Sequence, residues 1–480
     1  MRDLKLAFAL LGVALALGAA GDVLFNGRQL GINVFLFAAC FVAALALLLR
    51  KGRAPSHQGR RWMAGPLLLF SAAFAWHDSR LLIATNLLAL AGAIALGGLR
   101  RTHHRPQDAS VSEYAAGLAS AGVGTFVGAV HLLTEEIPWR DASHGLRGPR
   151  VAAVARGAAI GLPFVLLFGG LFMAADAIFK QYVTGAVPSF GHPASHIVFV
   201  AVFAWAGAGL LRDLVARRED ERALPAEWLL SREAPRLGST EIAIVLAALD
   251  LLFLSFVLVQ ARYLFGGSAL VENQAHLTYA QYARHGFFEL VAVSVLVLPI
   301  LLAANALARD RKNLVRALSA VLVALELIVA VSALQRLHIY EQQYGLTELR
   351  VYAIGVVGWL VCVFLWASVT ILRGRVRRFA TGAVVAGFVA TAVLNVLNPD
   401  ALIARTNLTR PQADLVYLQK LSDDAVPTLV AQASASPDPL VRARLQAQLS
   451  ARRVGPFDLL SWNASRERAR HALSRLGNSR

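Results

Sequence analysis

Residues 317–334 read ALSAVLVALELIVAVSAL, an apolar run that contains a single charged residue, Glu326. An α-helix needs about 20 mostly apolar residues to cross the hydrocarbon core of a bilayer, with a range of roughly 17–25. This run has a suitable length and composition, so we expect it to form a membrane-spanning helix.

Ten further segments of the same kind predict an all-α, polytopic transmembrane helix bundle of about eleven spans. These segments are residues 6–25, 32–49, 62–76, 81–99, 157–175, 197–211, 242–259, 286–307, 351–372 and 379–397. A twelfth stretch, residues 114–133, is rich in Gly and Ala and also carries polar residues, so its hydropathy alone leaves its relation to the membrane ambiguous.

The composition points to the same class of protein. Hydrophobic residues make up 57% of the 480 residues and charged residues 16%, whereas a soluble domain has roughly 45–50% and about 25%. The 47 Lys+Arg against 30 Asp+Glu could suggest binding to nucleic acid. The basic residues lie between apolar segments, however, so we expect the lipid bilayer as a partner and no nucleic acid.

Lys and Arg gather in alternate loops of the predicted bundle. The basic loops lie within residues 50–61, 100–156, 212–236, 309–316 and 373–378. Cytoplasmic loops carry an excess of Lys and Arg, and these loops share one side only if residues 114–133 do not cross. We therefore interpret 114–133 as a re-entrant or interfacial helix. The resulting prediction is a multi-pass protein of the bacterial inner membrane, with a cytoplasmic N-terminus and an extracytoplasmic C-terminus.

The chain divides into two predicted domains. Residues 1–397 form the transmembrane domain, and residues 398–480 form a small, helical C-terminal extracytoplasmic domain. The second part is polar, and its prolines at 411, 427, 437, 439 and 456 divide it into short helical stretches. If the protein binds a protein partner, this C-terminal domain is the expected binding module. The oligomeric state stays open.

Two acidic residues lie near the centres of predicted spans, Asp250 in 242–259 and Glu326 in 317–334. A charged side chain at the bilayer centre costs about 2.5–3.5 kcal/mol on insertion scales, so it requires a reason. Neither span contains Lys or Arg. One interpretation is a relay site for protons or cations, and the other is a polar contact that fixes helix packing.

A second set of polar residues lies at the predicted outer ends of the spans and could line an extracytoplasmic pocket. Arginines there could bind a phosphate or carboxylate through forked hydrogen bonds. The alternative is a network of ion pairs and interfacial tyrosines that holds the loops together. The candidate residues are Asp176, Arg262, Tyr263, Tyr279, Tyr282, Arg284, Glu289, Tyr344, Glu348, Arg350, Asn395, Asn398 and Asp400.

Motifs of soluble enzymes are missing from the sequence. We find no phosphate-binding Gly loop that ends in Gly-Lys-Ser/Thr, no His-Glu-x-x-His, no Cys-x-x-Cys and no Gly-x-Ser-x-Gly. No metal or cofactor is therefore expected. The two cysteines, Cys40 and Cys362, lie in apolar runs, and we expect them to be packing residues.

Five stretches resemble a known family of bacterial polytopic membrane proteins. They are GGLFMAADAIF (169–179), QARYLFGG (260–267), LTYAQYARHGFFEL (277–290), YGLTELRVY (344–352) and LNPD (397–400). The family is catalogued as domain of unknown function 4173 and has a sister family numbered 4153. The resemblance covers roughly residues 150–410. It implies an integral membrane protein and no assigned reaction, so it assigns no catalytic residue.

The sequence leaves three kinds of function open. A transporter or permease is indicated by the number of spans and by Asp250 and Glu326. A membrane scaffold with a polar pocket at the extracytoplasmic face is indicated by the tail and the outer polar residues. The alternative is a membrane-embedded enzyme that acts on a lipid-linked or envelope substrate, and we consider this less favoured than a role without catalysis.

Overall fold

The computed structural model describes most of the predicted helices. The described residues are 2–52, 58–98, 193–215, 239–265, 287–307, 312–375, 378–410, 413–435 and 438–478, together with Tyr114, Gly122, Thr125, Gly128, Ala129 and Leu132. Every regular element in these residues is a helix, and they contain no strand.

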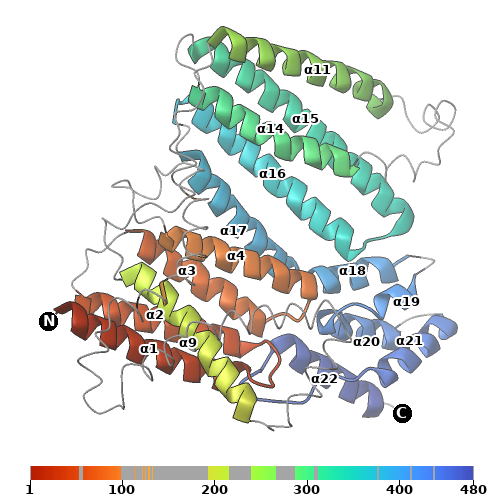
Figure 1. Cartoon of the computed structure of the whole chain (residues 1–480). Coiled ribbons are helices and arrows are strands. Elements are labelled where there is room, and N and C mark those ends of the chain that lie inside the picture. The colour runs from red at the N-terminus through yellow and green to blue at the C-terminus, as the bar shows by residue number, and fades with distance from the viewer. Residues whose placement is uncertain are drawn as a thin grey trace, which may run out of the picture.

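The N-terminal part of the chain forms a first group of helices (Figure 1). Its members are α1 (Arg2–Phe25), α2 (Ile32–Gly52), α3 (Gln58–Ala72) with the short 3-10 helix η1 (Ala73–Ala75), α4 (Arg80–Gly98) and α9 (Pro193–Val215). α1 packs against α9 and α2, and α3 packs against α4. Side chains such as Leu10, Leu48, Met63 and Leu211 are fully buried between them. Gly18 permits the close approach of α1 to α9, because a Cβ there would lie 2.6 Å from the carbonyl oxygen of Val200.

A second group of helices follows. Its members are α11 (Ser239–Phe265), α14 (Phe287–Leu307), α15 (Lys312–Tyr344), α16 (Glu348–Leu372) and α17 (Phe379–Leu397). α15 packs against α11, α14 and α16, around buried Leu246, Leu301, Leu322 and Phe364. α17 packs against both α16 and α4, so it connects the two groups, as Figure 1 shows.

Seven described helices are long and apolar enough to cross a membrane. They are Lys5–Phe25, Ile32–Arg50, Arg80–Gly97, Ser195–Val215, Asn313–Tyr344, Glu348–Ile371 and Phe379–Leu397. Three shorter apolar helices, Trp62–Ala75, Ile242–Leu258 and Val293–Asn305, correspond to further predicted spans. The predicted span 157–175 lies outside the described residues. The chain is thus a membrane protein whose described regular elements are all helices, and the count of eleven spans stays a prediction.

The stretch 114–133 is described only at six positions. The hydroxyl of Tyr114 lies 3.0 Å from the Thr381 hydroxyl oxygen of α17. Ala129 and Leu132 are buried in the core of the first helix group. These contacts place Tyr114, Ala129 and Leu132 against the helices, and the prediction that the stretch does not cross the membrane stays open.

The C-terminal residues form a set of short helices with its own core. They are α18 (Pro399–Leu408), α19 (Leu415–Leu418), η5 (Asp423–Ala425), α20 (Val426–Ala435), α21 (Pro439–Ala451) and α22 (Ala464–Asn478). We call residues 398–478 the tail. Asn398 separates α17 from α18: its φ is 50°, and its side chain accepts a hydrogen bond from the Ala401 N–H. Ile403, Leu429, Ala433 and Leu445 are buried in the tail core.

Two details differ from the sequence interpretation. The predicted outer loop 335–350 is largely helical, since α15 continues to Tyr344 and α16 begins at Glu348. No Gly or Pro occurs within α15, and the helix ends before Gly345, whose φ is 75°. The 33 residues of α15 span about 50 Å, which exceeds the roughly 30 Å of hydrocarbon. Cys40 and Cys362, which the sequence suggests as packing residues, are both exposed on the surface of the helices.

Candidate functional site

Two acidic side chains lie inside the second helix group. Glu326 of α15 is fully buried, and the Ser294 hydroxyl of α14 donates a hydrogen bond to its Oε1. Its other oxygen, Oε2, has no hydrogen-bond partner among the described residues. Asp250 of α11 is 8% exposed. Neither of its carboxyl oxygens has a hydrogen-bond partner among the residues that the structure describes. No hydrogen bond therefore joins the two carboxyls, although α11 packs against α15.

A second polar contact lies at the same α14–α15 interface. The Asn305 side chain of α14 donates a hydrogen bond of 2.9 Å to the Ser319 hydroxyl of α15. Ser319 is fully buried and precedes Glu326 by seven residues, which places both on one face of the helix. The interface thus contains two hydrogen-bonded polar pairs, Asn305–Ser319 and Ser294–Glu326. A carboxyl and hydroxyls are groups that can bind a proton or a small cation.

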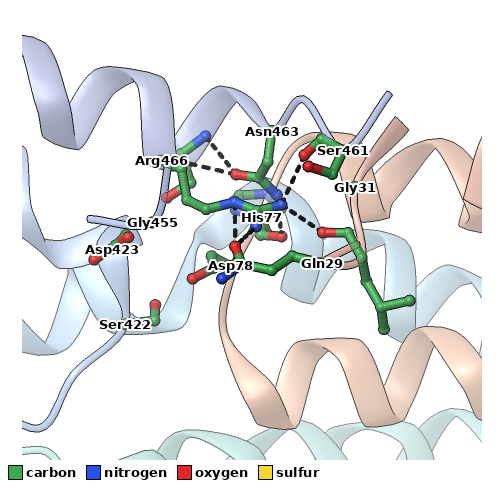
Figure 2. Close-up of polar contacts among 12 residues, drawn as sticks. Gln29, Gly31, His77, Asp78, Ser422, Asp423, Gly455, Ser461, Asn463 and Arg466 are labelled. Atoms are coloured by element: carbon green, nitrogen blue, oxygen red, sulfur yellow. Dashed lines mark hydrogen bonds and ion pairs between the residues drawn. The ribbon is translucent and has the colours of Figure 1, made fainter. Parts of the chain in front are cut away.

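The tail contacts the turns at one end of the helices through a largely buried polar network that we call the tail dock. Its members are Gln29, His77, Asp78, Asp424, Asn463 and Arg466, most of which Figure 2 labels. Asp424 is 5% exposed. Its Oδ1 lies 2.8 Å from Nδ1 of His77, and its Oδ2 accepts hydrogen bonds from the N–H groups of Asp78 (2.8 Å) and Ser79 (3.0 Å). One tail carboxylate therefore binds three groups of the turn between α3 and α4.

Asn463 fixes the start of α22 to the same turn. Its side-chain NH2 donates hydrogen bonds of 2.8 Å to the carbonyl oxygens of Phe74 and His77. Its Oδ1 accepts from the backbone N–H groups of Ser465 (2.9 Å) and Arg466 (3.1 Å), the usual N-cap arrangement. The cap of a tail helix thus also binds the body.

Arg466 connects the tail to the turn between α1 and α2. Its guanidinium is 5% exposed and donates hydrogen bonds to the Gln29 side chain and to the carbonyl oxygens of Leu30 and Ser461, as Figure 2 shows in part. It also lies 3.7 Å from Oδ1 of Asp78. A largely buried guanidinium with several acceptors is costly to disturb, so this residue helps to fix the position of the tail.

The turn between α15 and α16 binds the tail as well. Asn407 of α18 accepts a hydrogen bond from the Leu346 N–H and donates one to the Leu346 carbonyl, both 2.8 Å long. The Glu348 N–H donates a 2.8 Å hydrogen bond to the Tyr417 hydroxyl. Three turns that the charge pattern predicts on one side of the membrane therefore meet at one end of the molecule, where they hold the tail.

The aspartates in and beside the tail dock have shifted pKa values. Burial raises the pKa of Asp78 to about 6, although Arg466 opposes the shift. Burial also raises the pKa of Asp400, whose carboxylate accepts a 3.0 Å hydrogen bond from the Ser422 N–H. Burial acts to raise the pKa of Asp424 too, but its hydrogen bonds with His77 and Asp78 outweigh burial and lower it. Asp424 is thus the ionised anchor, and Asp78 and Asp400 are its titratable neighbours.

The structure distributes the predicted pocket residues over several contacts. Arg350 stacks 4.1 Å above the Tyr340 ring and donates a hydrogen bond to the Gly345 carbonyl. Asn395 of α17 exchanges hydrogen bonds of 2.9 and 3.1 Å with Asn86 of α4. Other described candidates lie at the tail end: Tyr344 ends α15, Glu348 begins α16, Asn398 caps α18, and Asp400 is fully buried.

The remaining candidates have no described side chain. Arg262 and Tyr263 lie near the end of α11 and Glu289 near the start of α14, at the level of the backbone. Asp176, Tyr279, Tyr282 and Arg284 lie outside the described residues. The extracytoplasmic pocket therefore stays a prediction. The described residues contain no group of three or more His, Cys, Asp or Glu that could hold a metal ion.

The sequence analysis missed most of the tail dock. His77, Asp78 and Ser79 form a short polar turn between two apolar segments. This turn was the sequence feature that could have indicated a contact site for the tail. Their partners Asp424, Asn463 and Arg466 lie more than 300 positions away in a tail with many similar polar residues. Nothing in the local sequence of the tail distinguishes these three.

Comparisons with known proteins give one family and one partial relative. The curated relative is "NADH-quinone oxidoreductase subunit N 1" of Sorangium cellulosum (strain So ce56), which is 30% identical over 189 residues. That region is 38% of this chain and 37% of the relative, so the chain spans little more than a third of the relative's length. No solved structure matches the chain significantly.

The family model covers residues 64–432, from α3 through most of α20. The match thus includes the described turns that bind the tail after α3 and α15, as well as the first helices of the tail itself. It corresponds to the sister family of the resemblance seen in the sequence, and no relation to family 4173 is shown. The chain belongs to the family described as "Domain of unknown function (DUF4153)".

Proposed function

We propose that this protein is a transporter or permease of the bacterial inner membrane, in which Glu326 binds and releases a proton or a small cation. The observation that carries the proposal is the environment of Glu326. It is fully buried between apolar helices, and only one of its two carboxyl oxygens has a hydrogen-bond partner among the described residues. An ionisable group of this kind within the membrane is costly and usually functional.

Neighbouring groups support this role. Ser294 can stabilise either protonation state, because a hydroxyl both donates and accepts hydrogen bonds. Asp250 supplies a second carboxyl in the adjacent helix, with no hydrogen-bond partner in the described part of the chain. A purely structural contact would favour a fully satisfied pair, since an unsatisfied buried polar atom costs about 1–3 kcal/mol.

The orientation follows from the charge pattern. The loop 373–378, with its arginines, would face the cytoplasm, and the tail would lie outside the cell. The exposed apolar side chains Leu88, Leu251 and Leu296 would face lipid. In this orientation α15 leads from the cytoplasmic side, past Ser319 and Glu326, to the turn that binds Asn407 of the tail.

The test is ion flux in vesicles that contain the purified protein. A pH-sensitive dye inside the vesicles would report proton entry after a potassium diffusion potential is imposed. Glu326→Gln keeps an acceptor for the Ser294 hydroxyl and removes the titratable group, so flux should fall to the level of protein-free vesicles. Asp414→Asn is the matched control, because Asp414 caps the short helix α19 in the tail. Equal flux in the parent and Glu326→Gln, with flux above protein-free vesicles, would contradict the assignment of Glu326.

A scaffold role is the second candidate, and the exposed apolar side chains of the tail favour it. Phe457 and Leu459 are 61% and 73% exposed in the segment between α21 and α22. A protein partner could cover them. Replacement of both by Ser should then reduce the mass of the native complex extracted from membranes without a change in ion flux. An unchanged mass would count against a partner at this segment.

A further inference from the structure

Residues of α16 and α17 line a long groove. This helix pair connects the second helix group to the first (Figure 1). Its volume is about 1010 Å³, at the upper end of ligand pockets in proteins. It begins at Arg378 and Thr381 and ends at Leu346, Leu402 and Thr406 beside the tail. Because the 25 residues of α16 span about 37 Å, the groove runs along the full thickness of the hydrocarbon core.

The walls of the groove are apolar. Small residues such as Gly355, Gly358 and Ala386 lower the wall, and an added Cβ at Gly358 would meet no atom within 4 Å. Trp359 and Trp366 also line the groove. Their indole N–H groups already donate hydrogen bonds to the carbonyl oxygens of Ala383 (3.4 Å) and Arg378 (3.1 Å). The middle of the groove therefore suits a long hydrocarbon chain that needs no hydrogen bonds.

Charged residues lie at both ends of the groove. Arg378 lines one mouth, Arg373 and Arg375 are exposed in the loop that precedes it, and the Arg316 guanidinium of α15 lies beside Gly374 of that loop. No Asp or Glu occurs between residues 349 and 399. At the opposite mouth the lining includes the acidic residue Glu341, and the Arg410 guanidinium there already donates hydrogen bonds to the carbonyl oxygens of Glu341 and Gln342. Arg350 at that end stacks on Tyr340 and donates to the Gly345 carbonyl. Guanidinium groups bind phosphate well, so an anionic headgroup fits the exposed arginines at the first mouth, the arginine mouth.

We propose that this groove is a binding site for an anionic phospholipid, with the phosphate at the arginine mouth and an acyl chain along α16 and α17. The groove is separate from Glu326. A negative result for lipid binding can therefore be distinguished from a negative result for ion transport. The arginine loop is one that the charge pattern places in the cytoplasm, which corresponds to the inner leaflet.

The two cysteines provide the test. Cys362 lies in the groove, whereas Cys40 is exposed on α2 in the other helix group. Delipidated protein in detergent would be treated with N-ethylmaleimide, and the labelling of each cysteine would be followed by peptide mass spectrometry. At phosphatidylglycerol concentrations about ten times the dissociation constant, roughly one site in eleven is empty, so Cys362 should react about tenfold more slowly. Cys40 should change little, and phosphatidylcholine should protect Cys362 less.

Two variants make the test specific. Gly358→Leu places a side chain in the groove and should remove the lipid effect on Cys362, while Gly12→Leu, at a position on α1 with equally open space, should not. Arg375→Gln should reduce the preference for phosphatidylglycerol over phosphatidylcholine. Equal slowing of Cys40 and Cys362, or equal protection by both lipids, would overturn the proposal. So would a Cys362 that is unreactive in delipidated protein while Cys40 reacts, because another part of the chain would then fill the groove.

Discussion

Replacement of Asp424 by Ala should release the tail from the turn between α3 and α4. The carboxylate accepts hydrogen bonds from two backbone N–H groups and contacts His77 at 2.8 Å, and it is 5% exposed. The substitution leaves these groups buried without their partner. A buried group left without its hydrogen-bond partner costs about 1–3 kcal/mol. Three groups lose their partner and one of them is only partly buried, so we expect a loss of about 3–5 kcal/mol in the free energy of tail docking.

Hydrogen exchange of the backbone amides measures this loss. A cost of about 3–5 kcal/mol corresponds to an opening equilibrium that shifts roughly a hundredfold to a few thousandfold, at about 1.4 kcal/mol per factor of ten. Amides of α20 should exchange faster by such a factor in detergent-solubilised Asp424→Ala. Asp414→Asn keeps a side-chain acceptor for the Tyr417 N–H in an exposed helix cap, so it should change the protection of α20 little. Unchanged protection of α20 in Asp424→Ala would refute the argument that Asp424 anchors the tail.

Three further predictions concern the same contacts. The pKa of Asp78 is raised from 3.8 to about 6, so the docked tail holds this proton more tightly and becomes less stable as the pH rises from about 4 to about 6. Asp78→Asn should remove most of this decline in α20 protection, after correction for intrinsic exchange rates, and an unchanged slope would refute the role of Asp78. Arg466→Met should speed amide exchange in α22 more than in α20, because the guanidinium binds the α1–α2 turn; equal effects would contradict this. Asn86→Leu alone leaves Asn395 without this partner and should lower the midpoint of thermal unfolding. Replacement of both Asn86 and Asn395 by Leu should restore part of the loss, and equal midpoints for the single and double variants would contradict this.

The sequence predicts the helices far better than the contacts between them. Hydropathy over about 20 residues is a local property, so segments such as 351–372 and 379–397 agree with α16 and α17 within a few residues. The C-terminal end of α15 was missed because most of residues 335–344 are polar. Hydropathy measures the preference of a segment for lipid, and it does not measure helix formation. Asp400 and Glu348 were found because they stand at span ends. Asp424 and Arg466 were not, since their importance arises only from turns brought together by folding.

The side of the membrane on which the tail lies can be tested with single cysteines. In a protein without Cys40 and Cys362, Leu440→Cys places a thiol on the exposed surface of α21, and Arg375→Cys places one at the opposite end of the helices. Intact cells would be treated with a membrane-impermeant maleimide. Our account predicts that the tail cysteine reacts in intact cells and that Cys at position 375 reacts only after permeabilisation. The reverse pattern, or labelling of both in intact cells, would contradict it.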